Sequence, residues 1–187
     1  MKKTVLTFGL IGGGILAAMM FATLPFLDKI GFDKGEVVGY TTMILAFMLV
    51  FFGIRSYREN VSGGQVTFGR AFAVGILITL VACVCYVIAW EIIYFKFMPD
   101  FVDKYASYTV EKVRASGANQ QVIDAKLQQM NSFKAMYDNP FINAAITFAE
   151  PFPIGLLVTL ISAAILRKKK TSAATRDEGL PAQLQAQ

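Results

Sequence analysis

Long apolar runs alternate with charged segments along most of the chain. A helix rises about 1.5 Å per residue, so about 20 apolar residues cross the roughly 30 Å hydrocarbon core of a bilayer. Four runs reach that length, and only one of the polar intervals between them is long. The pattern predicts an all-α integral membrane protein, a four-helix bundle with a helical insert between its third and fourth spans. The predicted spans are 4–27, 36–54, 71–97 and 141–166.

The first run follows a short basic start, Met1-Lys2-Lys3, which is also how a signal peptide begins. The apolar part of a signal peptide usually has about 7–15 residues, and this run is longer. No small-x-small cleavage site follows it, so we expect a retained first helix. Gly9 and Gly13 form a GxxxG pair within it, which favours close packing inside the protein over dimerisation.

The distribution of lysine and arginine predicts the orientation of the spans. With the N-terminus inside, the inner segments hold ten basic residues, and the longer outer segments hold eight. We therefore expect a multi-pass protein of the bacterial cytoplasmic (inner) membrane, with both termini in the cytoplasm. Trp90 and Tyr94, toward the outer end of the third run, are typical of an interfacial belt. The inner segments are 1–3, 55–70 and 167–187, and the outer segments are 28–35 and 96–140.

The long polar interval, 98–140, has apolar residues at helical spacing on both sides of a break at 116–119. We expect an extracytoplasmic pair of amphipathic helices that covers the outer mouth of the bundle. Pro99 should start the first of them, and Asn139-Pro140 should end the second. Together with the four spans, this insert completes a single membrane domain.

The domain is predicted to cover 1–170. The segment that follows it, 171–187, is rich in alanine, glutamine and polar residues and shows no periodicity. Such a composition does not bury enough apolar surface to order a chain. We therefore expect a disordered cytoplasmic tail.

Composition excludes several classes of function. The net charge is +5 at pH 7, but the basic residues lie at span ends without interleaved aromatics, so nucleic-acid binding is not indicated. The chain has no histidine, which removes His-based triads and His metal sites. Cys83 and Cys85 are two residues apart and point to different helix faces, so packing is favoured over a disulfide or a metal site. We expect no enzyme, no cofactor and no metal.

Two acids, Glu91 and Glu150, fall inside the predicted spans. A charged residue at the centre of a spanning helix costs about 2.5–3.5 kcal/mol on insertion scales, so such residues usually mark functional sites. Pro151 and Pro153 follow Glu150 and lack the N–H groups that complete a helix, so they should bend the span and free carbonyl groups. Thr147 is placed to satisfy one of these carbonyls. Each proline is also expected to move the preceding residue out of helical geometry.

The two acids admit two interpretations. Both fall in the outer half of the membrane, and two carboxyl groups that share one site cannot easily both ionise. Such a pair is typical of a proton or cation site. In the structural alternative, Glu91 pairs with Lys96 or reaches headgroup water, while Glu150 satisfies the backbone that the prolines free.

Three arginines, Arg55, Arg58 and Arg70, flank a turn at Gly63-Gly64. They are candidates for contact with an anionic lipid headgroup or a phosphate. The alternative is an ordinary basic loop on the inner side. No GK[ST] sequence is present, so the segment is not a P-loop.

Several short motifs together resemble one family. The resemblance covers about residues 1–170, and its most specific part is the Glu-Pro-x-Pro-x-Gly stretch. The motifs are Arg55-Ser-Tyr-Arg-Glu59 with Gly63-Gly64, Thr67-Phe68-Gly69-Arg70-Ala71-Phe72, Ala115-Ser-Gly117, Met130-Asn-Ser-Phe133 with Tyr137 and Asn139-Pro140, and Thr147-Phe-Ala-Glu150-Pro151-Phe-Pro153-Ile-Gly155. In these the chain resembles the domain of unknown function 4199 family, small bacterial four-span membrane proteins. The resemblance implies a fold and a topology, and it implies no activity.

These observations favour a structural or interaction component of the bacterial cytoplasmic membrane, which contacts the lipid bilayer and binds an envelope protein through 98–140. The alternative is a small proton- or cation-coupled transporter or channel subunit that uses Glu150 and Glu91. A carrier of this size would be expected to form a homo-oligomer. A lipid-modifying enzyme is the weakest of the three classes, because no nucleophile–base pair is apparent.

Overall fold

The computed structural model describes residues 1–168, and these are helical apart from short connections and one isolated backbone bridge. The four helices long and apolar enough to cross a membrane confirm the predicted all-helical multi-pass architecture. The predicted tail, 171–187, lies outside the described residues. The four membrane-length segments are Lys2–Phe26, Phe32–Asn60, Phe68–Phe97 and Pro140–Leu166.

Shorter elements adjoin the long helices, and three of the long segments consist of two elements each. The first segment joins α1 to the 3₁₀ turn η1. The fourth segment joins α7 to α8, and the third ends in a π-helical turn, η2. The elements in chain order are α1 (Lys2–Thr23), η1 (Leu24–Phe26), α2 (Leu27–Ile30), α3 (Phe32–Asn60), α4 (Phe68–Ile92), η2 (Ile93–Phe97), α5 (Phe101–Ala115), α6 (Gln120–Tyr137), α7 (Pro140–Ala149) and α8 (Pro151–Leu166).

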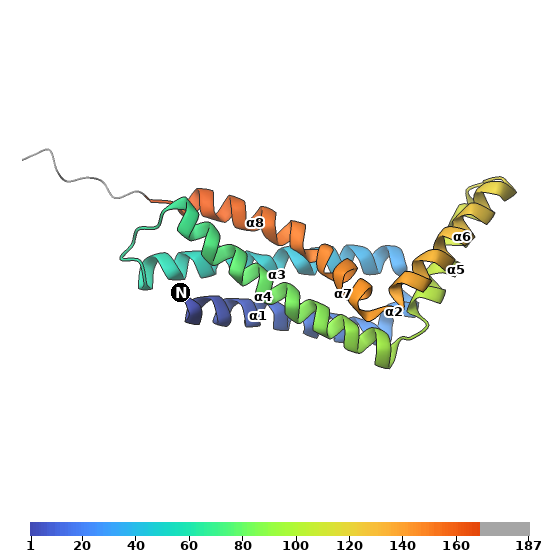
Figure 1. Ribbon diagram of the computed structural model, residues 1–187, viewed down its shortest axis with the longest axis horizontal. Coiled ribbons are helices and arrows are strands. Elements are labelled where there is room, and N and C mark those ends of the chain that lie inside the picture. The colour runs from blue at the N-terminus through green and yellow to red at the C-terminus, as the bar shows by residue number, and fades with distance from the viewer. Residues whose placement is uncertain (169–187) are drawn as a thin grey trace, which may run out of the picture.

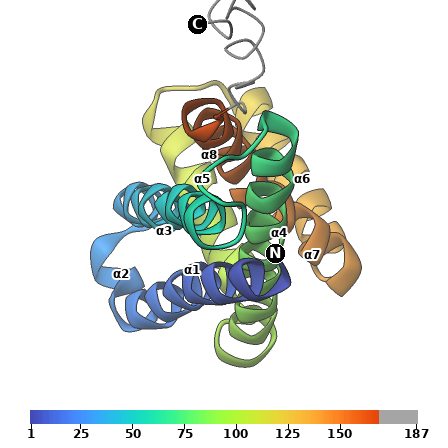
Figure 2. The same cartoon turned by 90° about the vertical axis from the view of Figure 1, so that its left-hand side faces the viewer.

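The long helices lie side by side, with α3 and α4 between α1 and α8 (Figure 2). Helix α4 contacts α1, α3 and α8, so it is central to the packing. The closest approach of α1 to α4 needs glycine. A Cβ atom at Gly9 would lie 2.7 Å from Val81, and one at Gly13 would lie 2.5 Å from the Cβ of Cys85. The GxxxG pair therefore serves packing within the chain.

Large apolar side chains fill the space between these helices, with Phe47, Ile54 and Ile78 at most 1% exposed. The outward faces are apolar as well, and Leu45 and Ile165 are 61% and 66% exposed. Extended exposed apolar surface marks a protein or membrane contact. Lipid is the environment that fits a surface of this kind on helices of this length.

The second long helix extends beyond the prediction at both ends, because α3 runs from Phe32 to Asn60. The polar loop expected at 28–35 is therefore reduced to α2 and Gly31, whose φ of 75° favours glycine. At the other end, Arg55 to Glu59 belong to the helix rather than to a loop. The ion pair between Arg55 and Glu59 spans one helical turn, which supports this extension.

Helices α5 and α6 form an antiparallel hairpin that projects obliquely from one end of the long helices (Figure 1). Gly117, with φ 77°, makes the turn, and the side chain of Asn119 caps α6 by accepting the N–H of Val122. Helix α5 begins at Phe101, soon after Pro99. Asn139-Pro140, the predicted end of the second hairpin helix, also starts the next helix, because the side chain of Asn139 caps α7.

The proline pair divides the last long segment at Glu150, between α7 and α8 (Figure 1). The expectation that Glu150 leaves helical geometry was wrong, since its φ and ψ are −74° and −59°. Phe152, which precedes Pro153, is likewise inside α8. Proline is well accommodated in the first turn of a helix, where its fixed φ is already helical. The chain therefore restarts its helix at once and remains a single membrane-length segment.

Candidate functional site

A cavity of ≈ 400 Å³ lies at the hairpin end of the long helices. Its wall combines the end of α1, the start of α3, the end of α4, the α7–α8 junction and the base of the hairpin. Most of the wall is apolar or aromatic, with two carboxyl groups. The lining residues are Met20, Thr23, Leu24, Leu27, Phe32, Gly35, Glu36, Gly39, Tyr40, Met43, Tyr86, Trp90, Ile93, Met98, Phe101, Tyr105, Phe133, Tyr137, Ile146 and Glu150.

Glu150 lines this cavity from the α7–α8 junction. The hydroxyl of Tyr86, on α4, donates a hydrogen bond of 2.9 Å to its Oε2. Tyr86 is itself only 8% exposed, so this bond lies between the helices. Glu150 therefore faces α4 and the cavity. A neutral hydroxyl is thus a partner for this acid, and sequence reasoning did not single out Tyr86.

The second predicted acid, Glu91, lies outside the cavity wall. Its Oε1 is buried and has no hydrogen-bond partner among residues 1–168. The acid that shares the cavity with Glu150 is instead Glu36, from the start of α3. Helix rotation explains the difference, because Glu91 is five residues beyond Tyr86 on α4 and thus on another face.

Trp90 and Tyr94 connect the long helices to the hairpin. The indole N–H of Trp90 donates to the hydroxyl of Tyr137 at 2.8 Å, and the hydroxyl of Tyr94 donates to Oδ1 of Asp138 at 2.8 Å. Tyr94 is 2% exposed, so it is not on the lipid-facing surface that an interfacial belt implies. Both side chains anchor the end of α6.

Tyr137 lies at the centre of this anchor. Burial raises the pKa of its phenol above 10, while hydrogen bonds with Thr147 and Trp90 lower it. The carboxyl groups of Glu150 and Glu91 act in the raising direction, because a phenolate would face negative charge. The phenol is therefore held in its neutral form.

A buried amide on α7 supports Tyr137 and organises the helix before the proline pair. Asn143 is fully buried, and its Nδ2 donates to the backbone carbonyl of Tyr137 at 3.3 Å. Thr147 donates to Oδ1 of Asn143 at 3.1 Å. The expected contact between Thr147 and a freed carbonyl is therefore replaced by this side-chain bond. In the sequence, the only sign that Asn143 has a special role is that it is a single asparagine within an apolar run.

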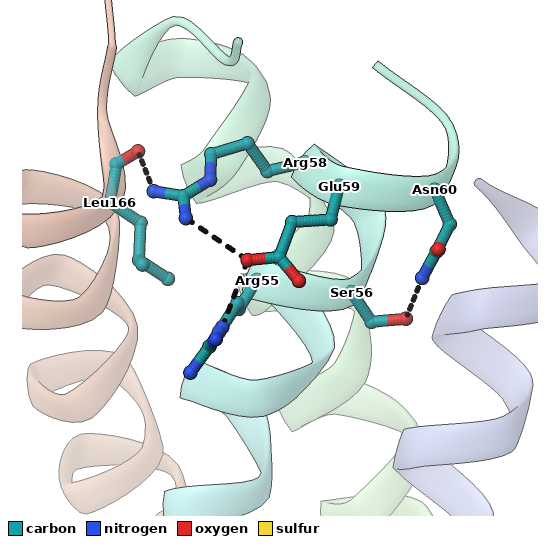
Figure 3. Close-up of polar contacts among 6 residues, drawn as sticks. All are labelled: Arg55, Ser56, Arg58, Glu59, Asn60 and Leu166. Carbon is teal, nitrogen blue, oxygen red and sulfur yellow. Dashed lines mark hydrogen bonds and ion pairs between the residues drawn. The ribbon is translucent and has the colours of Figure 1, made fainter. Parts of the chain in front are cut away.

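The three arginines lie at the opposite end of the long helices, and Figure 3 shows the contacts of two of them, Arg55 and Arg58. The guanidinium of Arg58 donates to the carbonyl of Leu166 at 3.4 Å and to Glu59 at 3.3 Å. Arg55 also binds Glu59, at 3.0 Å, from a more exposed position. Arg58 therefore caps the end of α8. Arg70 lies exposed on the first turn of α4.

Cys83 is buried and Cys85 is half-buried, and both are free cysteines. Neither of them lines the cavity. Within residues 1–168 no group of three or more acids or cysteines is placed to hold a metal ion. The chemistry available at the cavity is therefore that of carboxyl groups, phenols and aromatic faces.

Comparisons with known proteins agree with the resemblance in the motifs. No curated protein and no solved structure matches the chain. A family model described as Protein of unknown function (DUF4199) matches residues 7–168. This match covers the four membrane-length helices and the hairpin together, from early in α1 to the bridge after α8. The chain therefore belongs to the DUF4199 family of proteins of unknown function.

Proposed function

We propose that this protein is a non-enzymatic interaction component of the bacterial cytoplasmic membrane, and that its α5–α6 hairpin binds an envelope protein. The four long helices would form a bundle in the bilayer with both termini in the cytoplasm, which places the hairpin outside. The observation that carries the proposal is the projection of the hairpin beyond the ends of the long helices (Figure 1).

The near part of the hairpin is firmly attached. The ring of Phe32, at the start of α3, lies 5.4 Å from that of Tyr105 and 5.1 Å from that of Tyr108. Lys112 extends this attachment through an ion pair of 2.8 Å with Asp33. Aromatic pairs of this kind add about 0.5–1.5 kcal/mol each beyond area burial. The attachment fixes the direction in which the hairpin projects.

The far part, 113–124 with the following turn of α6, is held by the pairing of α5 with α6. Ile123 and Val110 are buried in that pairing. Val122 and Leu127 on α6 remain 50% and 47% exposed. Exposed apolar side chains on a rigid projection are suited to a protein contact, and acids and bases are balanced over the whole insert, 98–140. Apolar contact therefore contributes more to the proposed interface than net charge does.

Excision of 113–124 tests the proposal. The contact between Lys134 and Asp103 sets the hairpin register, which places residue 112 opposite residue 125. A short glycine-containing turn can therefore join these positions and retain the pair between Lys112 and Asp33. We expect a photo-crosslinker at position 122 to capture a discrete partner in the full chain. The shortened protein should insert and fold, but that partner should no longer co-purify with it.

A matched crosslinker at position 45, on the lipid-facing side of α3, is the control. It should give no protein adduct of the same mass. Co-purification of the same partner with the shortened protein, or no discrete adduct at position 122 in the full chain, would count against the interaction proposal.

A proton- or cation-coupled transporter or channel subunit is the second candidate, and the hydrogen bond between Tyr86 and Glu150 at the cavity favours it. Flux driven by a pH gradient in proteoliposomes tests it, with Glu150→Gln and Glu91→Gln beside the unaltered protein. Loss of flux in folded Glu150→Gln would support transport. Absence of flux in every folded protein would leave the interaction role.

A further inference from the structure

The cavity at the hairpin end has a lining that is chemically specific. Aromatic side chains make up the largest share of its wall, and Glu36 and Glu150 are the charged residues in the described lining. Its ≈ 400 Å³ lies within the roughly 300–1,000 Å³ typical of small-molecule sites. A bound molecule would therefore face π-surfaces and carboxyl groups, without a basic side chain in the described wall.

Aromatic faces and carboxylates both attract positive charge. The face of an aromatic ring carries negative electrostatic potential, and cages of such rings recognise quaternary ammonium groups. Tyr40, Tyr86, Trp90 and Tyr105 contribute such rings from three different helices. A carboxylate near a cation adds a direct charge–charge attraction that strengthens where water is excluded.

The two acids reach the cavity from different elements. Glu36 extends from the start of α3 and Glu150 from the α7–α8 junction, and both are exposed. The Oε2 of Glu150 accepts the hydrogen bond of Tyr86, which leaves its second carboxyl oxygen for a ligand. An entering cation would therefore meet carboxyl groups from two different parts of the wall.

We propose that this cavity binds a small organic cation with an apolar body, of the quaternary ammonium type. The apolar and aromatic wall suits the body of such a molecule, and the two carboxyl groups suit its charge. An inorganic divalent cation is disfavoured, because such ions require about six or more oxygen ligands and this wall offers few. The proposal goes beyond the hairpin interface and does not involve Glu91.

The chain carries its own reporter for this site. Its single tryptophan, Trp90, lines the cavity. Binding of benzyltrimethylammonium to the full chain in nanodiscs of zwitterionic lipid can therefore be followed by tryptophan fluorescence and by calorimetry. The uncharged comparison is neopentylbenzene, which has the same shape with carbon in place of the charged nitrogen.

We expect saturable binding of benzyltrimethylammonium and at least about tenfold weaker binding of neopentylbenzene, equivalent to one charge-assisted contact. Glu36→Gln should weaken the binding of the cation about tenfold, and Glu150→Gln at least as much. Glu91→Gln is the matched control, because it removes an acid outside the wall, and it should bind normally.

Glu36 is exposed, so Glu36→Gln keeps the test decisive even if Glu150→Gln fails to fold. Equal affinity for the charged and uncharged molecules would overturn the proposal and indicate a site for apolar chains. Unchanged cation binding in Glu36→Gln and in folded Glu150→Gln would overturn it as well.

Discussion

The α3–α4 turn and the hairpin occupy opposite ends of the long helices, and the two ends are closed to different degrees. At the α3–α4 end, Ile54 and Ala71 are fully buried, and the N–H of Lys168 donates to the carbonyl of Val66 at 2.9 Å. At the hairpin end, a cavity of ≈ 400 Å³ remains between the helices. The long helices thus pack closely around Ile54 and Ala71 at one end and leave a cavity at the other.

The polar residues differ between these ends in a corresponding way. The arginine contacts of the closed end act on the protein itself, since Arg58 binds the last turn of α8 and Glu59. At the open end, Glu36 and Glu150 face a space that the chain does not fill. The comparison indicates that the conspicuous arginines are partly structural, whereas the less conspicuous acids Glu36 and Glu150 line an open cavity.

The largest expected effect concerns the sides of the membrane on which the two ends lie. In intact cells, a cysteine at position 118 should react with a membrane-impermeant maleimide, while one at position 62 should react only after permeabilisation. The expected difference is complete, because the reagent does not cross the bilayer. The native cysteines are replaced in both proteins. Equal labelling of both positions in intact cells would contradict the proposed orientation.

The second prediction contrasts glycines from the two ends. A Cβ atom at Gly75 would lie 2.8 Å from Ile54 and from Thr159, whereas one at Gly39 would have no neighbour within 4 Å. Overpacking costs about 1–3 kcal/mol, so Gly75→Val should lower the stability of the protein measured by thermal unfolding in detergent. Gly39→Val, beside the cavity, should be nearly neutral. Similar losses in both would show that the hairpin end is as tightly packed as the other.

A smaller effect should separate the two arginines of the closed end. Loss of a hydrogen bond to a charged group removes about 1.5–3 kcal/mol, so Arg58→Ala should destabilise the packing of α8 against α3. Arg55→Ala removes an exposed ion pair, and such pairs contribute about 0.2–1 kcal/mol. Urea titration of both variants measures the difference. If Arg55→Ala has the larger effect, the cap on Leu166 is not what holds this end together.

The smallest effect depends on pH at the base of the hairpin. Since the pKa of Tyr137 is raised in the folded protein, its contribution to stability is complete below pH 10. That contribution is lost as the pH rises through the raised pKa. We expect the fluorescence of Trp90, which bonds to Tyr137, to change only above pH 10. The change should be absent in Tyr137→Phe, and its persistence there would assign it to another group.

The spans could be predicted because length and hydrophobicity decide whether a segment crosses a membrane, whatever its neighbours are. The proline break at Glu150 was also apparent, since proline lacks an N–H in every context. The helical geometry of Glu150 was not predicted. A residue before proline usually prefers extended geometry, but here α8 begins at the next residue and Glu150 keeps helical angles. The early start of α3 at Phe32 depends on ring contacts with α5, which are distant in sequence.

The cavity itself was only partly predictable. Glu150 was a candidate because an acid in a span is unusual, but its partners depend on which faces of α3 and α4 turn inward. Tyr86 and Glu36 therefore emerge only from the arrangement of the helices. Lys96 was suggested as a partner of Glu91, yet Oε1 of Glu91 has no hydrogen-bond partner in the described chain.

The double proline also changes the number of hydrogen-bond donors at the start of α8. The first four N–H groups of any helix have no partner within that helix, and lipid offers none. In α8, positions 151 and 153 are proline and therefore have no N–H at all. Two of the four N–H groups that would lack a partner at the start of α8 are therefore absent. The helix break beside Glu150 therefore leaves fewer N–H groups without a hydrogen-bond partner than a break without prolines would.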